Sequence, residues 1–311
     1  MRFNVIFMGT PDFALPSLEM LIREHNVTAV VTKQDTPKGR GNKMTPPPVK
    51  VLASAHGIPV LQPQSARSDE FYDEMRQYPC DVVVTAAYGK ILPQRVLDIP
   101  KYGTINVHAG LLPEYRGAAP LWHCIINGEK ETGVTTMLTD AGMDTGDILL
   151  EYRCGLDDSI TVGELTDKLA VEGAELLKIT LEKLADGTLE RRKQDDSRAG
   201  YAPMIKKEDA HIDWTKNAKQ VHDLIRGTEP SPGSFTFYNG ERFKIRKSEV
   251  LARSEHFGAP GEIIRVSKDG IDVAAGEGLL RILELQTDSS KRMDVASYLN
   301  GHKIAENTIL C

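Results

Sequence analysis

The chain has 311 residues, a length that suits two ordinary domains or one large one. Its content of 41% hydrophobic and 26% charged residues is typical of a globular protein, and a formal net charge of −6 excludes a chain that is basic throughout. RNA is not excluded as a partner, because phosphates respond to a local basic patch rather than to the total charge.

No apolar run reaches the roughly 18 residues of a membrane-spanning helix. The N-terminus lacks the long apolar stretch and the cleavage site of a signal peptide. Cys80, Cys124, Cys154 and Cys311 are scattered, without a C-x-x-C pair that would indicate a zinc or redox site. We therefore expect a cytoplasmic protein with reduced thiols and no membrane association.

The first half of the chain alternates buried strands with helical patterns. An apolar run at 4–8 ends at Gly9, apolar residues then recur at helical spacing, and a second strand pattern follows at 28–32. Further strands are predicted at 81–87, 103–110 and 134–139, with helices at 49–55 and 119–126 among the segments between them. This order predicts an α/β domain with an open, mostly parallel, Rossmann-like sheet, which binds ligands at the carboxyl ends of its strands.

The residue composition and the hydrophobic pattern change after residue 188. Residues 189–207 are charged and weakly periodic, like a linker. A helix is predicted at 217–226, followed by short strands with hairpin turns at Asn239-Gly240 and Asp269-Gly270. We therefore predict an α/β domain at 1–188, a linker at 189–207 and a small OB-like β-barrel domain at 208–311.

The first strand-to-helix turn, Gly9-Thr10-Pro11, does not favour a nucleotide cofactor. It has one glycine of the G-x-G-x-x-G pattern, and Pro11 removes a backbone N–H that would cradle a phosphate.

Asn106 and His108 form the densest polar cluster, at the end of an apolar strand. Residues two apart on a strand share a face, so both side chains point into one site. A carboxamide can donate to a developing oxyanion, and an imidazole exchanges protons near neutral pH. The alternative is that both side chains only hydrogen-bond neighbouring loops.

The next strand leads into a glycine-rich turn that carries Asp140, Asp144 and Asp147. Such a turn brings backbone and carboxylates close to a ligand, and Asp144 is placed to orient His108. Alternatively, the acids cap backbone N–H groups of a solvated turn. No second ligand cluster accompanies them, so no metal is expected.

A basic, glycine- and proline-rich loop spans residues 33–50. It carries Lys33, Lys38, Arg40, Lys43 and Lys50 against a single acid, Asp35. Such a loop suits contacts with nucleic-acid phosphates, although a basic loop is also common as plain solvated surface.

Several motifs resemble the folate-dependent formyltransferase family, and the resemblance spans nearly the whole chain. They are Asn106-Val107-His108-Ala109-Gly110-Leu111-Leu112-Pro113, Tyr115-Arg116-Gly117-Ala118-Ala119-Pro120, Met143-Asp144-Thr145-Gly146-Asp147, Gly9-Thr10-Pro11-Asp12-Phe13, Tyr88-Gly89-Lys90-Ile91-Leu92-Pro93 and Ile212-Asp213-Trp214. The resemblance implies the formyltransferase fold, with Asn106, His108 and Asp144 as catalytic residues. The basic loop and the second domain are most similar to members of the family that act on a tRNA.

The resemblance also implies the substrates. The formyl donor would be 10-formyltetrahydrofolate, and the acceptor would be the amino group of a methionyl initiator tRNA, attacked directly within a ternary complex. Contacts to the folate are implied for Gly110, Leu111, Leu112, Pro113, Tyr88, Gly89, Ile91, Leu92, Thr139 and Asp140. Contacts to the tRNA are implied for Lys38, Arg40 and Lys43, with Arg40 at the position of the key arginine.

Two positions depart from the family pattern, and three alternatives stay open. Gly110 stands where many relatives have serine, and Ser231 replaces a tryptophan that is common in the tRNA enzymes. The same catalytic residues would serve a formyltransferase for a sugar amine or the hydrolase part of a formylfolate dehydrogenase. A non-catalytic RNA-binding module on the same fold is the third alternative. A monomer is the default expectation.

Overall fold

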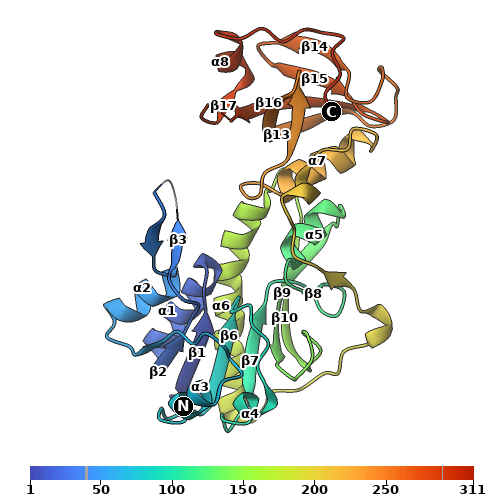
Figure 1. The fold of residues 1–311 in the computed structure, drawn as a ribbon. Helices are drawn as coiled ribbons and strands as arrows, with labels where there is room; N and C mark the ends of the chain where they lie inside the picture. The colour runs from blue at the N-terminus through green and yellow to red at the C-terminus, as the bar shows by residue number, and fades with distance from the viewer. Residues whose placement is uncertain (39–40, 289) are drawn as a thin grey trace. The chain divides into compact units, whose positions relative to one another are not determined.

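The computed structural model describes residues 1–38, 41–288 and 290–311. The chain forms two compact units (Figure 1). The first unit comprises Met1–Pro120, Glu131–Cys154 and Thr166–Ala202, and the second comprises Leu121–Lys130, Gly155–Leu165 and Pro203–Cys311. Residues 189–202, which the sequence assigned to a linker, are thus part of the first unit; the domain limits at 188 and 208 stay a prediction.

A seven-stranded sheet of order β10-β9-β7-β6-β1-β2-β5 forms the centre of the first unit. Neighbouring strands from β5 to β7 pair in parallel, whereas β9 runs antiparallel to β7. The strands are β1 (Asn4–Gly9), β2 (Asn26–Val31), β5 (Val60–Leu61), β6 (Val82–Ala86), β7 (Thr104–His108), β9 (Glu131–Leu138) and β10 (Ile148–Gly155). The predicted, mostly parallel Rossmann-like sheet is confirmed.

Continuous apolar sequence explains the central position of β1 and β6. All residues of β6, and all but Asn4 of β1, are buried, as expected for parallel strands covered on both faces. The helices of the first unit are α1 (Leu15–Glu24), α2 (Pro48–Ala55), α3 (Asp69–Met75) and α4 (Gln94–Leu97). Helix α5 (Pro120–Ile126) belongs to the second unit from Leu121 on, and α6 (Val162–Asp186) belongs to the second unit up to Leu165 and to the first from Thr166. Phe71 and Met75 of α3 pack with Ile6, Met8 and Val83 of the sheet in one apolar cluster.

The reversal of direction at β9 decides where the following loop begins. His108, the last residue of β7, pairs with Thr135, whereas Ile105 pairs with Leu138. The backbone N–H of Thr139 then donates to Thr104 O at 2.8 Å. The glycine-rich loop therefore starts at the amino end of β7, and it must turn back along the sheet to reach His108.

Two short pairs of strands complete the first unit. β3 (Thr36–Lys38) and β4 (Lys43–Thr45) form an antiparallel hairpin in which Lys38 and Lys43 are partners. β8 (Arg116–Gly117) pairs in parallel with β11 (Tyr201–Ala202). β11 thus ties the segment after α6 back to the loop that follows β7.

The second unit is an antiparallel, barrel-like β-domain, as the sequence predicts. Its sheet has the order β12-β13-β16-β15-β14, and β17 pairs with β16. The two predicted hairpin turns are confirmed; Asn239 and Gly240 have φ of 48° and 81°, the left-handed conformation that such turns require. The elements are α7 (Ala218–Gly227), β12 (Phe235–Tyr238), β13 (Glu241–Ala252), β14 (Ile263–Ser267), β15 (Gly270–Ala274), β16 (Leu279–Thr287), β17 (Met293–Asp294) and α8 (Val295–Leu299).

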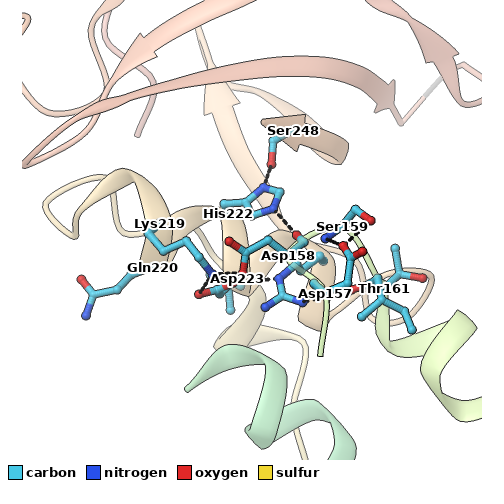
Figure 2. A network of polar contacts seen from close by, with 12 residues as sticks. Asp157, Asp158, Ser159, Thr161, Lys219, Gln220, His222, Asp223 and Ser248 are labelled. Carbon is cyan, nitrogen blue, oxygen red and sulfur yellow. Dashed lines mark hydrogen bonds and ion pairs between the residues drawn. The ribbon is translucent and has the colours of Figure 1, made fainter. Parts of the chain in front are cut away.

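A polar network ties the loop before α6 to α7 within the second unit (Figure 2). His222 is buried; its Nε2 donates to Asp158 O at 2.8 Å, and its Nδ1 accepts from Ser248 Oγ at 2.9 Å. Lys219 Nζ lies 2.6 Å from Asp223 Oδ1 and 3.3 Å from Asp158 Oδ1. Lys219 therefore joins Asp158 of this loop to Asp223 of α7 through two ion pairs. Within residues 1–38, 41–288 and 290–311, no helix combines the length and apolarity needed to cross a membrane.

Candidate active site

Asn106 presents the donor end of its amide to the site. Thr85, its parallel partner on β6, donates its hydroxyl to Asn106 Oδ1 at 2.8 Å. Since the amide oxygen is engaged by this bond, the Nδ2 hydrogens point the other way. Asn106 is half-buried, at the carboxyl end of a parallel strand. It is therefore placed to donate to a partial negative charge on a ligand.

His108 lies two residues further along the same face of β7 and is 5% exposed. Its Nε2 lies 2.7 Å from Tyr115 O, so the ring donates Nε2–H to this carbonyl. Its Nδ1 lies 3.8 Å from Asp144 Oδ2. Nδ1 is therefore the nitrogen that can exchange a proton in the site.

Asp144 is held in an uncommon conformation next to His108. Its φ is 54°, in the left-handed region, and its Oδ2 accepts from the backbone N–H of Gly117 at 2.8 Å. The neighbouring Gly146 passes so close to Leu138 that an added Cβ would lie 1.7 Å from the Leu138 carbonyl oxygen. The glycines of this turn let it run tightly against β9 and bring Asp144 to His108.

Asp140 has a different environment from Asp144. Its Oδ1 accepts from Gly142 N at 3.0 Å and from Thr145 Oγ1 at 2.6 Å, and the residue is exposed. Asp140 thus stabilises the turn itself. Among residues 1–38, 41–288 and 290–311, no group of three or more His, Cys, Asp or Glu side chains is arranged to hold a metal ion; the expectation of no metal stays a prediction.

The segment after His108 is anchored by Thr135 of β9. Thr135 Oγ1 donates to Gly110 O at 2.7 Å and accepts from Leu112 N at 3.4 Å. Leu111 and Leu112 are buried. At Gly110, a Cβ would lie 2.9 Å from Pro120 Cβ and 3.2 Å from His108 Nε2, so a larger residue at this position needs Pro120 to shift. Gly110, Leu111, Leu112 and Pro113 therefore form a preformed backbone wall beside His108.

The second predicted folate loop follows β6. Tyr88 and Leu92 are buried in the apolar core of the sheet, and burial raises the pKa of Tyr88 to about 12. Gly89 has φ of 70°, and Ile91 is 49% exposed. Tyr88 and Leu92 thus fix the loop, while Gly89 and Ile91 leave backbone and an apolar side chain at the surface.

Thr139 lies level with the amino end of β7, away from His108. Its hydroxyl is buried and, within the described residues, has no hydrogen-bond partner. A buried polar atom without a partner is costly, and a polar heterocycle such as the ring of a folate would supply one. The residues of this loop therefore fit a bound folate.

Asp35, the single acid of the basic loop at residues 33–50, is paired with Lys50 of the same loop. Lys50 Nζ lies 2.8 Å from Asp35 Oδ1 and 2.8 Å from Gln62 Oε1, and the hydrogen bond from Lys50 lowers the pKa of Asp35. Lys43 is exposed on β4. Since Asp35 is paired with Lys50, it does not offset the charge of Lys43. Arg40 lies outside the described residues, as does the side chain of Lys38.

These features are those of a formyltransferase, and the chain belongs to this family. The family model described as "Formyl transferase" matches residues 1–181, and the model of the "Formyl transferase, C-terminal domain" matches residues 204–303. The methionyl-tRNA formyltransferase of Acetivibrio thermocellus is 54% identical over 99% of this chain and 99% of that protein. The protein of the same name from Caldanaerobacter subterraneus is 52% identical, again over 99% of both chains.

Solved structures share the fold at low sequence identity. The sugar 3N-formyl transferase WlaRD, solved in the presence of dTDP and 5-N-formyl-THF, is 19% identical with a TM-score of 0.68 and covers 94% of this chain and 100% of its own. HypX from Aquifex aeolicus, in complex with tetrahydrofolic acid, is 18% identical with a TM-score of 0.64; the match covers 96% of this chain and 47% of HypX.

Four positioning contacts were missed from the sequence. They come from Thr85, Tyr115 O, Gly117 N and Thr135. Thr85 carried a signal, because the strand predicted at 81–87 neighbours the one that holds Asn106. The other three depend on how loops fold over the sheet, and no local pattern predicts them.

Proposed function

We propose that this chain transfers the formyl group of 10-formyltetrahydrofolate to the amino group of methionyl initiator tRNA, for translation initiation in the cytoplasm, and that it acts as a monomer. The observation that carries the proposal is the convergence of Asn106 and His108, on one face of β7, with the Asp144 carboxylate 3.8 Å from His108 Nδ1. The two relatives of 52–54% identity bear the name of this activity.

Asn106 and His108 stabilise the charge that develops during transfer. The folate, when bound, supplies a formyl carbon that is open to attack by the amine. Asn106 donates from Nδ2 to the formyl oxygen, and a well-placed donor of this kind contributes about 3–4 kcal/mol. His108, with Nε2–H held by Tyr115 O, donates to the same oxygen from a protonated Nδ1.

Asp144 balances the protons. A C–N bond forms between the formyl carbon and the attacking nitrogen, and the bond from that carbon to N10 of the folate breaks. The attacking nitrogen loses one proton and N10 gains one. Asp144 takes the proton, directly or through water, and passes it on, because one of its oxygens already faces His108. No covalent formyl-enzyme forms in this scheme.

The three loops that follow β6, β7 and β9 hold the folate. Gly110, Leu111, Leu112 and Pro113 contribute backbone groups on one side. Tyr88, Gly89, Ile91, Leu92, Thr139 and Asp140 contribute the remainder. The assignment is supported by the exposed Ile91 side chain and by the Thr139 hydroxyl, which has no hydrogen-bond partner in the described part of the chain.

The hairpin of β3 and β4 contacts the tRNA through Lys38, Arg40 and Lys43. Its support is the surplus of positive charge left once Lys50 and Asp35 have paired with each other. Such contacts to phosphates position the acceptor without reading its sequence.

The test is a formylation assay with purified protein, 10-formyltetrahydrofolate and methionyl initiator tRNA. His108→Ala is expected to abolish formyl-methionyl-tRNA formation, whereas His56→Ala, at an exposed histidine, leaves it intact. Release of free formate, or transfer only to a small sugar amine, would keep the chemistry and reject the tRNA as acceptor. Tight tRNA binding with no transfer by the unmutated protein would indicate a non-catalytic module.

A further inference from the structure

Gln194 stands out in the segment that follows α6. Gln194 is half-buried, whereas all the remaining residues between 191 and 199 are exposed. The segment is fixed on both sides of it within the first unit. Arg192 and Ile148 exchange two backbone hydrogen bonds of 2.8 and 2.9 Å, and Gly200 O accepts from Arg116 N at 3.0 Å. Gln194 is therefore delivered to a defined place.

The amide of Gln194 donates hydrogen bonds to the backbone carbonyls on both sides of Thr145. Its Nε2 donates to Asp144 O and to Gly146 O, each at 2.7 Å. Its Oε1 accepts from Arg116 Nε at 3.0 Å and Nη2 at 2.9 Å. Both amide hydrogens and both oxygen lone pairs are used, so the orientation of the amide is unambiguous. Arg116 thus aims the donors of Gln194 at the turn.

These bonds hold the turn at the point where its backbone is strained. Asp144 has φ of 54°, a conformation that a non-glycine residue keeps only when its surroundings impose it. Gln194 fixes the carbonyl of Asp144, while Gly117 N, the neighbour of Arg116, fixes its carboxylate at 2.8 Å. The β8 strand and Gln194 therefore hold Asp144 from two directions.

We infer that Gln194 is a positioning residue for formyl transfer, which keeps the Asp144 carboxylate in line with His108. The inference rests on the proposed role of Asp144. It gives the segment at 189–202 a part in the reaction itself, because that segment supplies the side chain that sets the geometry of Asp144. In this inference Gln194 acts through Asp144, by its hydrogen bonds to the Asp144 and Gly146 carbonyls.

The experiment replaces Gln194 by methionine, which has a similar length and no N–H donor. Gln194→Met is expected to lower kcat of methionyl-tRNA formylation on the order of 100-fold, the cost of misplacing a catalytic group by about 1 Å. The KM for tRNA is expected to stay unchanged. Asp196→Asn is the matched control. Asp196 Oδ1 accepts from the same Arg116 Nη2 at 2.6 Å, and asparagine keeps this acceptor, so the kcat of Asp196→Asn is expected to equal that of the wild type.

A double-mutant cycle separates positioning from general structural support. In an Asp144→Asn background, Gln194→Met is expected to have no further effect, because the carboxylate that it positions is already gone. A second, independent loss in that background would overturn the inference, and so would a wild-type kcat for Gln194→Met. If Gln194→Met does not fold, Gln194→Glu carries the same test, since it keeps the acceptor for Arg116 and removes both donors.

The same cycle distinguishes the two proposals. An Asp144→Asn variant with wild-type kcat would overturn the proposed role of Asp144, and this inference with it. A strongly impaired Asp144→Asn beside an unimpaired Gln194→Met would overturn the inference alone.

Discussion

Asn106 illustrates how a single hydrogen bond decides what an amide can do. An asparagine amide can rotate to present either its oxygen or its nitrogen, and only the nitrogen stabilises an oxyanion. The Thr85 hydroxyl binds the oxygen at 2.8 Å and thereby selects the useful orientation. The side chain is thus preorganised by the neighbouring strand before any substrate arrives.

Removing the donor of Asn106 is expected to slow the reaction strongly. Asn106→Asp has nearly the same shape but presents no N–H, so kcat is expected to fall by roughly 100- to 1000-fold, as for other lost oxyanion donors. The measurement is single-turnover formylation at saturating substrate. Thr85→Val, which frees the amide to rotate, is expected to give a smaller loss, and Thr85→Ser, which keeps the hydroxyl, to give none. Equal rates for Thr85→Val and Thr85→Ser would contradict this account.

The sequence predicts the positions of Asn106 and His108 better than it predicts the groups that hold them in place. Asn106 and His108 could be placed on one face of a strand because side chains alternate along β-structure, and the structure has them there. The contact between His108 and Tyr115 O could not be predicted, because it depends on how the chain after residue 110 turns back. The role assigned to each of these residues stays a prediction.

At the scale of elements, the positions of the strands were predictable and the direction of β9 was not. An apolar run such as that at 134–138 is compatible with parallel or antiparallel pairing, because both bury it equally well beside β7. The linker expected at 189–207 shows the converse: its exposed, charged residues resemble a tether, and only the tertiary structure reveals the contacts of Gln194.

The helix α7 carries a pH dependence of stability in His222. Burial lowers the pKa of His222 below its usual value of 6.5, so the folded state favours the neutral ring and the unfolded state takes up the proton first. The contribution of neutral His222 to the free energy of unfolding is complete above pH 6.5 and is lost as the pH falls through the folded-state pKa. Each unit of pKa difference corresponds to about 1.4 kcal/mol.

Urea titrations at pH 7.5 and pH 5.5 measure this effect. The unfolding midpoint of the wild type is expected to fall between these pH values by more than that of His222→Gln, which cannot be protonated. His256→Gln, at an exposed histidine of the same unit, is expected to behave like the wild type. The same pH dependence in wild type and His222→Gln would show that His222 does not carry it.

For the whole molecule, the net charge of −6 conceals the local distribution that matters for a polyanionic substrate. Lys43 is exposed on a hairpin whose acid is already paired, so we expect it to contact phosphate. Lys43→Glu is expected to lower kcat/KM for tRNA at low salt and to reduce the slope of log(kcat/KM) against log[salt] by about one unit.

The comparison variant is Lys183→Glu, which makes the same charge change at an exposed lysine near the end of α6. It is expected to leave the salt slope at the wild-type value. An equal reduction of the salt slope by Lys43→Glu and Lys183→Glu would mean that total charge, rather than the hairpin, governs tRNA use. A wild-type slope for Lys43→Glu would mean that Lys43 does not contact phosphate.

The loop that carries Asp144 begins and ends at neighbouring positions of the sheet, because Leu138 N donates to Asp147 O at 2.9 Å. Residues 139–146 can therefore change in number without moving a neighbouring strand, and the entropic cost of a longer loop grows slowly. What their number does set is how far Asp144 reaches along β7. Over evolutionary time, insertions and deletions in this stretch are expected to be tolerated by folding and rejected by catalysis. We therefore expect the proposed role of Asp144, rather than the stability of the sheet, to set the length of this loop.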